Sequence, residues 1–131
     1  MKKILILDDE PAVRHSFVDF FEDQMWQPVQ AESGEDALLL LESERPVAAI
    51  VDMRLPGMDG NEFVREACKR GFIMAFVICT GSPEYNVPDD LKALYCVSNH
   101  LFKKPVADFI ALEKQVICTV NDIDEASNEK K

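Results

Sequence analysis

Five polar side chains follow apolar runs of the sequence, and their types suit cation binding and the chemistry of a phosphoryl group. They are a pair of carboxylates, a third carboxylate, a hydroxyl and an ammonium: Asp8, Asp9, Asp52, Thr80 and Lys104. Carboxylates gathered in one place raise one another's pKa unless a cation is present, and Mg2+ prefers such oxygen ligands. A carboxylate can also attack phosphorus to form an aspartyl-phosphate. An ammonium and a hydroxyl could then bind the phosphoryl oxygens.

The apolar runs before these residues predict buried parallel strands, because they are short and are separated by helix-like stretches. The predicted strands cover residues 3–8, 29–31, 47–52, 74–79 and 99–103. The alternation predicts a single-domain α/β fold of the (βα)5 type, with helices on both faces of a five-stranded parallel sheet. The expected arrangement is the flavodoxin-like, doubly wound sheet with strand order 2-1-3-4-5. Ligands bind at the carboxyl ends of such strands, so the three aspartates should converge there.

Helix boundaries follow from capping residues and prolines. Asp9 is expected to cap the first helix, with Pro11 in its first turn, and Asp59 is expected to cap the third. Pro105 is expected to open the last helix. The domain is expected to span residues 1–121, and the polar residues 122–131 to form a disordered tail or the start of a linker.

The composition limits the function classes. The net charge is −10, from 24 acidic and 14 basic residues, which disfavours direct binding to nucleic acid. No run approaches the roughly 18 apolar residues of a membrane span, and a strand begins too early for a signal peptide, so we expect a cytoplasmic protein. The four cysteines form no CxxC pair, and we expect reduced, mostly buried thiols at Cys68, Cys79, Cys96 and Cys118.

Four segments together resemble the receiver domain of two-component response regulators, the CheY-like family. They are Ile6-Leu7-Asp8-Asp9-Glu10, the run from Val51 through Asp52-Met53-Arg54-Leu55-Pro56-Gly57-Met58-Asp59 to Gly60, then Thr80-Gly81 and Lys104-Pro105. The similarity covers about residues 2–121. A lone Asp-Asp pair would be weak evidence, but the run from Asp52 to Gly60, with the other three segments in order, is specific.

The resemblance implies a Mg2+-dependent phosphoacceptor. Asp52 would take a phosphoryl group from a partner's phosphohistidine. Asp9 would bind Mg2+ directly and Asp8 mainly through water, with the backbone carbonyl of Arg54 completing the protein ligands. The chain would be a signalling switch rather than an enzyme, promoting only its own phosphorylation and slow dephosphorylation.

The resemblance also assigns roles to the other strand ends. Lys104 would pair with the phosphoryl group, Thr80 would hydrogen-bond it and report its presence, and Pro105 would be a cis-proline. The signal would pass to the face made by the fourth helix, fifth strand and fifth helix as a population shift. The implied partners are a histidine kinase or phosphotransfer protein and an output partner or downstream effector domain, with a second copy of the chain as a further candidate.

Three features depart from the family pattern. Leu101 occupies the usual place of an aromatic switch residue, with His100 and Phe102 beside it, and Phe102 is expected in the core. The segment between Thr80 and Lys104 is slightly long and contains two prolines, which predicts a short or distorted fourth helix. Arg54 and Ser82 occupy positions that, by the resemblance, tune hydrolysis of the aspartyl-phosphate.

Two other functions compete with this one. A phosphatase of the haloacid dehalogenase type also uses an aspartate nucleophile and Mg2+, but it expects an acid where Arg54 stands and a nucleophile near its first strand. A degenerate receiver acting as a constitutive binding module is disfavoured because all five polar strand-end residues are present. The sequence leaves open whether the chain acts alone or belongs to a longer regulator.

Overall fold

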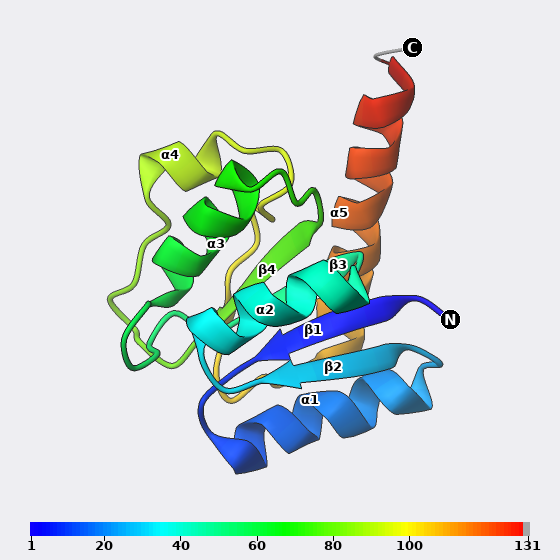
Figure 1. Ribbon diagram of the computed structural model, residues 1–131. Coiled ribbons are helices and arrows are strands. Elements are labelled where there is room, and N and C mark those ends of the chain that lie inside the picture. The colour runs from blue at the N-terminus through cyan, green and yellow to red at the C-terminus, as the bar shows by residue number, and fades with distance from the viewer. Residues whose placement is uncertain (130–131) are drawn as a thin grey trace.

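The computed structural model describes residues 1–129, and strands and helices alternate along the whole of this range (Figure 1). The strands are β1 (Lys3–Leu7), β2 (Gln27–Ala31), β3 (Ala48–Val51), β4 (Ala75–Thr80) and β5 (Phe102–Lys103). The helices are α1 (Pro11–Asp23), α2 (Gly34–Glu44), α3 (Gly60–Lys69), α4 (Asp89–Lys92) and α5 (Phe109–Glu129).

The strands form one parallel sheet in the order β2-β1-β3-β4-β5, which confirms the predicted flavodoxin-like topology. All residues of β3 and β4 are buried, as are the last four of β1, because helices cover both faces of the sheet. Val51, the last residue of β3, pairs with Leu7, the last of β1. The next residues, Asp52 and Asp8, therefore leave the sheet at the same edge.

Three helices, α2, α3 and α5, begin with side-chain caps, and one expected cap is wrong. The Asp59 carboxylate accepts the Glu62 N–H at 2.8 Å, so the predicted cap of α3 is confirmed. Asp9, however, does not cap α1, because Glu10 occupies the cap position and makes no side-chain cap bond. The Asp9 carboxylate is therefore not committed to the helix.

The last helix differs from the prediction at both ends. It begins at Phe109 rather than at Pro105, because the Asp108 carboxylate accepts the Ala111 N–H, while Pro105 follows a cis peptide bond in the preceding loop. Where the sequence predicts a disordered tail or the start of a linker from residue 122, α5 continues to Glu129. Buried Ile123 extends the apolar stripe of the helix beyond residue 121. Residues 130 and 131 of the expected tail lie outside the described residues, and the domain boundary stays a prediction.

The segment between β4 and β5 is irregular. The predicted short α4 is confirmed, since this helix covers four residues. β5 is shorter than expected, and the chain before it joins β4 through a single bridge between Phe76 and Val97. This part of the sheet edge therefore has fewer backbone ties than the β1–β3 part.

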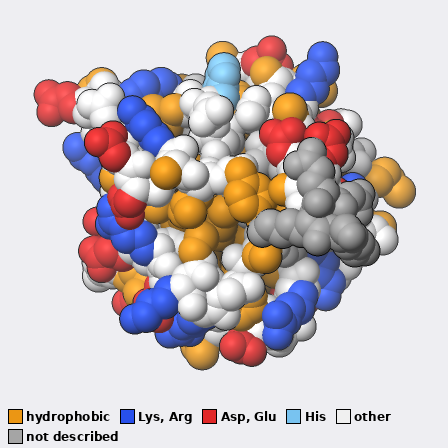
Figure 2. Space-filling model, turned by 90° about the horizontal axis from the view of Figure 1, so that it is seen from above, with side chains coloured by type: hydrophobic (Ala, Val, Ile, Leu, Met, Phe, Trp, Pro, Cys, Tyr) orange, Lys and Arg blue, Asp and Glu red, His pale blue; other side chains and the backbone are white. Residues whose placement is uncertain are grey.

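A cavity of about 310 Å3 lies at the opposite edge of the sheet from Asp8 and Asp52, between Val47, Met74 and the last turns of α5. Figure 2, which looks down on the end where α5 leaves the body, shows apolar side chains gathered in the middle of that face. Within residues 1–129, no helix is both long and apolar enough to cross a bilayer.

Candidate functional site

The Lys104 ammonium joins two aspartates that are far apart in the sequence. Its Nζ lies 2.9 Å from Asp8 Oδ2 and 3.3 Å from Asp52 Oδ2. The two aspartates are 2% and 4% exposed, so these charges interact with little screening by water. Three of the predicted site residues therefore form one buried cluster, which contains two carboxylates and one cation.

Asp52 is a carboxylate held in an unfavourable environment. Burial raises its pKa above the ordinary value of 3.8, and the nearby Asp8 charge adds to this effect. The Lys104 charge and the hydrogen bonds from Lys104 and the Arg54 N–H act in the opposite direction without cancelling it. A further cation near Asp52 would therefore stabilise its charged form.

The same surroundings favour the charged form of Lys104, whereas they disfavour the charged form of Asp52. Burial alone would lower the pKa of its ammonium, but the hydrogen bond to Asp8 and the charges of Asp52 and Asp8 raise it above 10.5. The ammonium therefore remains charged at neutral pH and is available to pair with an anion.

A group of carboxylates beside this cluster has the chemistry of a divalent cation site. Among the described residues, oxygens of Asp8, Asp9 and Glu10 lie within 4.8 Å of one another. Asp9 and Glu10 are exposed, so they can exchange water for a ligand. An all-oxygen set with exposed carboxylates and a raised carboxyl pKa nearby fits Mg2+. Glu10 lies with Asp8 and Asp9 in this group, which does not include Asp52, the other predicted carboxylate ligand.

Arg14 supports the loop that carries these carboxylates. Its guanidinium is 6% exposed and donates to the Asp8 backbone carbonyl at 2.9 Å. It also donates to Gln30 Oε1 at 3.1 Å and to Glu32 Oε1 at 3.4 Å, which links the loop to β2 and the residue after it. Arg14 therefore fixes the backbone of a predicted metal ligand.

Thr80 ends β4 at the same edge, and its side chain is fully buried. Its hydroxyl accepts the Ser82 N–H at 3.1 Å, and its backbone carbonyl accepts the Lys104 N–H at 2.9 Å. Thr80 is thus bonded both to the loop that follows it and to the strand end that carries Lys104.

Ser82 is held from two sides. The Arg54 guanidinium donates to Ser82 Oγ at 3.3 Å, so the two positions singled out in the sequence are in contact. The Lys103 ammonium donates to the backbone carbonyls of Ser82 and Pro83, at 3.2 and 3.3 Å. Lys103 thus fixes this loop, whereas Lys104 contacts the aspartates, which separates the roles of two adjacent lysines.

A cavity of about 460 Å3 opens beside Lys104. It lies between α1 and the loop before α5, with Glu10, Phe17, Gly81 and Phe109 in its lining. The cavity has an apolar floor next to the buried charges, so an aromatic or heterocyclic group could approach Lys104 from this side.

Sequence analysis missed Arg14 and undervalued Glu10. Arg14 shares one face of α1 with the buried Phe17 and Phe21, at spacings of three and seven residues. A cation within an apolar stripe is a signal that could have identified it, since an isolated buried charge is costly without partners. Phe102, which is expected in the core, is only partly buried and packs against the core, as does Leu101.

Comparisons with known proteins agree with this geometry. The family that matches is the response regulator receiver domain, over residues 4–125. Sporulation initiation phosphotransferase F of Bacillus subtilis is 32% identical over 104 residues, which are 79% of this chain and 82% of that protein. The positive alginate biosynthesis regulatory protein of Pseudomonas aeruginosa is 33% identical over 86 residues, 63% of this chain but only 34% of that relative.

Solved structures show the same fold. A CheY-like response regulator receiver domain protein from Methanospirillum hungatei superposes with a TM-score of 0.81 at 24% identity, covering 96% of this chain and 98% of that one. The response regulator TrrA from Thermotoga maritima, solved in complex with Mg2+ and BeF, gives a TM-score of 0.76 at 26% identity, covering 91% and 99%. The family match over nearly the whole chain and the similarity to the Bacillus phosphotransferase show that the chain belongs to the response regulator receiver domain family.

Proposed function

We propose that this chain is a phosphorylation-controlled switch that accepts a phosphoryl group on Asp52 in the presence of Mg2+. The observation that carries the proposal is the contact of one ammonium, Lys104, with both Asp8 and Asp52 in a buried cluster. Asp52 is a buried carboxylate whose pKa burial raises above its ordinary value, so a Mg2+ ion beside it would stabilise the charged form that attacks phosphorus. This supports Asp52 as the proposed nucleophile.

Asp9 and Asp8 would have different roles in binding Mg2+. Asp9 is exposed and would bind Mg2+ directly, together with the backbone carbonyl of Arg54 and the Asp52 carboxylate. Both carboxylate oxygens of Asp8 already accept hydrogen bonds, from the Glu10 N–H and from Lys104, so Asp8 would act through water. Bound Mg2+ would supply positive charge to the phosphoryl oxygens.

Lys104 and Thr80 would recognise the product. The Lys104 ammonium, now paired with Asp52, would pair with a phosphoryl oxygen instead, and the Thr80 hydroxyl can donate while still accepting from Ser82. Because Thr80 is bonded to Ser82, its movement would pull the loop after β4. The change would then reach the α4–β5–α5 face as a population shift.

The phosphoryl donor would be a histidine kinase or a phosphotransfer protein. The cavity beside Lys104 offers an apolar floor for the imidazole ring of a phosphohistidine. The relative from Bacillus subtilis is named a phosphotransferase, and the Thermotoga structure holds Mg2+ with BeF; both support transfer to this site. The net charge of −10 argues against nucleic acid as the output partner.

The test is chemical phosphorylation of the full chain. Acetyl phosphate with Mg2+ should add one phosphoryl group, and borohydride reduction followed by peptide mass mapping should locate it at Asp52. The Asp52→Asn variant should stay unmodified, and chelation of Mg2+ should abolish the reaction in the wild type.

Two outcomes would overturn the proposal. Modification of wild type at another residue would remove Asp52 from its role, and so would equal modification of Asp52→Asn. Continuous turnover of p-nitrophenyl phosphate by the wild type would instead support the phosphatase function. Asp59→Asn serves as a matched control, because that aspartate caps α3 and should leave phosphorylation unchanged.

A further inference from the structure

The loop between Thr80 and α4 is held from the side of β5 by a lysine that the proposed reaction does not use. The Lys103 ammonium donates to the backbone carbonyls of Ser82 and Pro83, at 3.2 and 3.3 Å. Lys103 is the last residue of β5, and successive side chains of an extended chain point in opposite directions. Lys104 therefore contacts the aspartates of the site, whereas Lys103 holds the loop.

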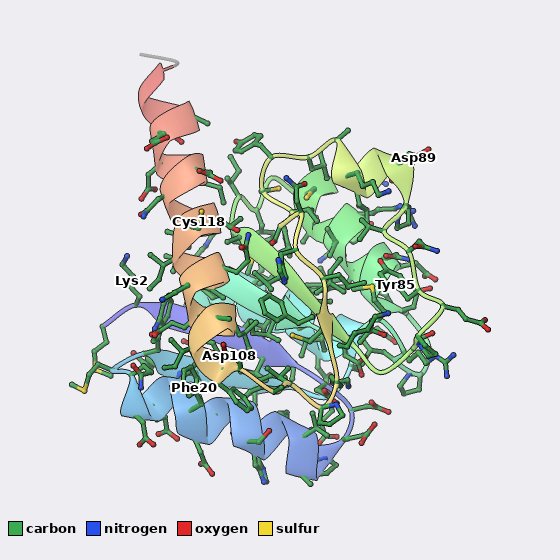
Figure 3. All side chains as sticks on the ribbon, turned by 180° about the vertical axis from the view of Figure 1, so that it is seen from behind. Lys2, Phe20, Tyr85, Asp89, Asp108 and Cys118 are labelled. Carbon is green, nitrogen blue, oxygen red and sulfur yellow. The ribbon has the colours of Figure 1, made fainter. Side chains whose placement is uncertain are left out.

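The same loop is held from the side of α3 by two side-chain contacts. The Tyr85 hydroxyl donates to Asn61 Oδ1 at 2.6 Å, and Tyr85 lies half-buried beside α3 (Figure 3). Farther along the loop, the Arg65 guanidinium donates to both carboxylate oxygens of Asp90, at 2.8 and 3.1 Å. Asn61 and Arg65 are one helical turn apart, so α3 presents both to the loop. These contacts, together with those of Lys103, form the loop latch.

The loop has little regular structure of its own. Residues 81–88 form no helix or strand. Among these described residues there is one hydrogen bond between backbone groups, from the Tyr85 N–H to the Ser82 carbonyl at 3.5 Å. Val87 is partly buried and packs against the core. The loop latch therefore supplies the polar contacts that fix the position of the loop relative to β5 and α3.

The loop latch acts on Thr80 through Ser82. The Ser82 N–H donates to the Thr80 hydroxyl at 3.1 Å, and the Ser82 carbonyl accepts from Lys103, so Ser82 is tied to both residues. A phosphoryl group on Asp52 would draw the Thr80 hydroxyl toward the site, and Ser82 with it. This movement would stretch the hydrogen bonds from Lys103 and displace Tyr85 relative to α3.

We propose that the loop latch is an inhibitory device, which lowers the affinity of the Asp52 site for a phosphoryl group. The inference rests on the proposed function and names residues of this chain that regulate that site. The latch favours the arrangement in which the Thr80 hydroxyl accepts from Ser82, so the arrangement that binds a phosphoryl group is a minor population. The apparent affinity of a ligand falls in proportion to the fraction of the protein that is competent to bind it. Loss of one latch contact should raise this fraction, and with it the affinity, by about threefold.

The sign of the effect distinguishes the loop latch from simple electrostatics. Loss of the positive charge of Lys103, next to Lys104, would by itself weaken the binding of an anion. Release of the latch strengthens that binding, so the two explanations predict opposite effects for Lys103→Met. Tyr85→Phe removes a hydroxyl without changing the charge, and it therefore tests the latch alone.

The experiment titrates the full chain with beryllofluoride in saturating Mg2+ and measures the dissociation constant from the amide NMR spectrum. Lys103→Met and Tyr85→Phe should each bind about threefold more tightly than the wild type, and the double variant about tenfold more tightly. Lys103→Arg keeps donors for the two loop carbonyls and should bind as the wild type does. The matched controls Tyr95→Phe and Lys114→Met alter exposed side chains outside the latch and should leave the affinity unchanged.

The outcomes separate the loop latch from the proposed function. If the wild type binds beryllofluoride, unchanged or weaker binding by either Lys103→Met or Tyr85→Phe overturns the latch and leaves the proposed function standing. If the wild type shows no binding in the presence of Mg2+, the proposed function and the latch are overturned together.

Discussion

The carboxyl edge of the sheet and the β4–β5 segment, residues 81–101, are held in very different ways. The carboxyl edge is positioned by paired buried strands, with β1 and β3 in register up to the residues before Asp8 and Asp52. The β4–β5 segment carries one short helix and one isolated bridge to β4. A rigid charge site is thus joined, through Thr80, to a segment with few backbone ties.

The β4–β5 segment places Leu91, Cys96 and Val97 in the core, and its side-chain polar contacts to α3 lie nearer the surface. The Tyr85 hydroxyl donates to Asn61 Oδ1 at 2.6 Å, and Arg65 pairs with Asp90 at 2.8 Å. Figure 3 shows Tyr85 on the loop beside α3 and Asp89 at the start of α4. Exposed ion pairs and single hydrogen bonds contribute little each, so these polar contacts restrain the segment only weakly.

The largest expected effect is a loss of stability when the cation of the cluster of Asp8, Asp52 and Lys104 is removed. Lys104→Met leaves the buried carboxylates Asp8 and Asp52 without their cation, and should lower the free energy of unfolding at pH 7 by about 3 kcal/mol. Urea denaturation without divalent metal measures this loss. Lys103→Met is the matched control and should cost less than about 1 kcal/mol, since Lys103 contacts only loop carbonyls. Equal losses in the two variants would contradict the contrast between the regions.

The next-largest effect is expected on the affinity for Mg2+, through the loop that carries Asp8, Asp9 and Glu10. Arg14→Met removes the hydrogen bond to the Asp8 carbonyl and should weaken Mg2+ binding by about tenfold, as for other residues that orient metal ligands. Isothermal titration calorimetry on the folded protein measures the affinity directly. Phe21→Leu controls for general destabilisation, because Phe21 is buried on the same helix away from the loop. An unchanged Mg2+ affinity in Arg14→Met would limit that residue to a structural role.

A smaller effect on the free energy of unfolding, opposite in sign to that of Lys104→Met, is expected at Asp52. Its pKa in the fold lies above 3.8, so its charged form destabilises the native state, and stability is lost as the pH rises through the folded pKa. Asp52→Asn should therefore be more stable than the wild type at pH 7 by about 1 kcal/mol. This gain in stability should disappear at pH values below the pKa of the Asp52 carboxyl in the unfolded chain. Denaturant titrations of both proteins across this pH range, without metal, check the sign, and a less stable variant at pH 7 would refute it.

The smallest effect is expected in the β4–β5 segment. Tyr85→Phe removes the hydrogen bond to Asn61 and should cost about 1 kcal/mol or less. Hydrogen exchange should show faster exchange of amides in residues 82–90 and little change in β1 and β3. Tyr95→Phe is the control, since that side chain is 48% exposed. Faster exchange spread evenly over the sheet would mean that the two regions do not open separately.

The sequence predicted the positions of the strand-end residues better than the contacts of the β4–β5 segment, for a physical reason. Asp8, Asp52 and Lys104 follow strands whose apolar patterns can be read locally, and parallel strands bring their ends together without further information. The contact of Arg54 with Ser82 joins residues 28 positions apart and depends on how separate segments pack. The helical end of α5 was missed because polar residues on its exposed side hide the apolar stripe that ends at Ile123.

The central claim is that phosphorylation of Asp52 changes Thr80 and Lys104 and moves the β4–β5 segment while β1 and β3 stay fixed. The most direct measurement is the amide NMR spectrum with and without Mg2+ and beryllofluoride, for wild type and Asp52→Asn. We expect wild-type shifts at Asp52, Thr80 and Lys104 that extend through residues 81–101, few shifts in the body of β1 and β3, and none of these in Asp52→Asn. Wild-type spectra that do not change around Thr80 and Lys104, or equal changes in Asp52→Asn, would contradict the claim.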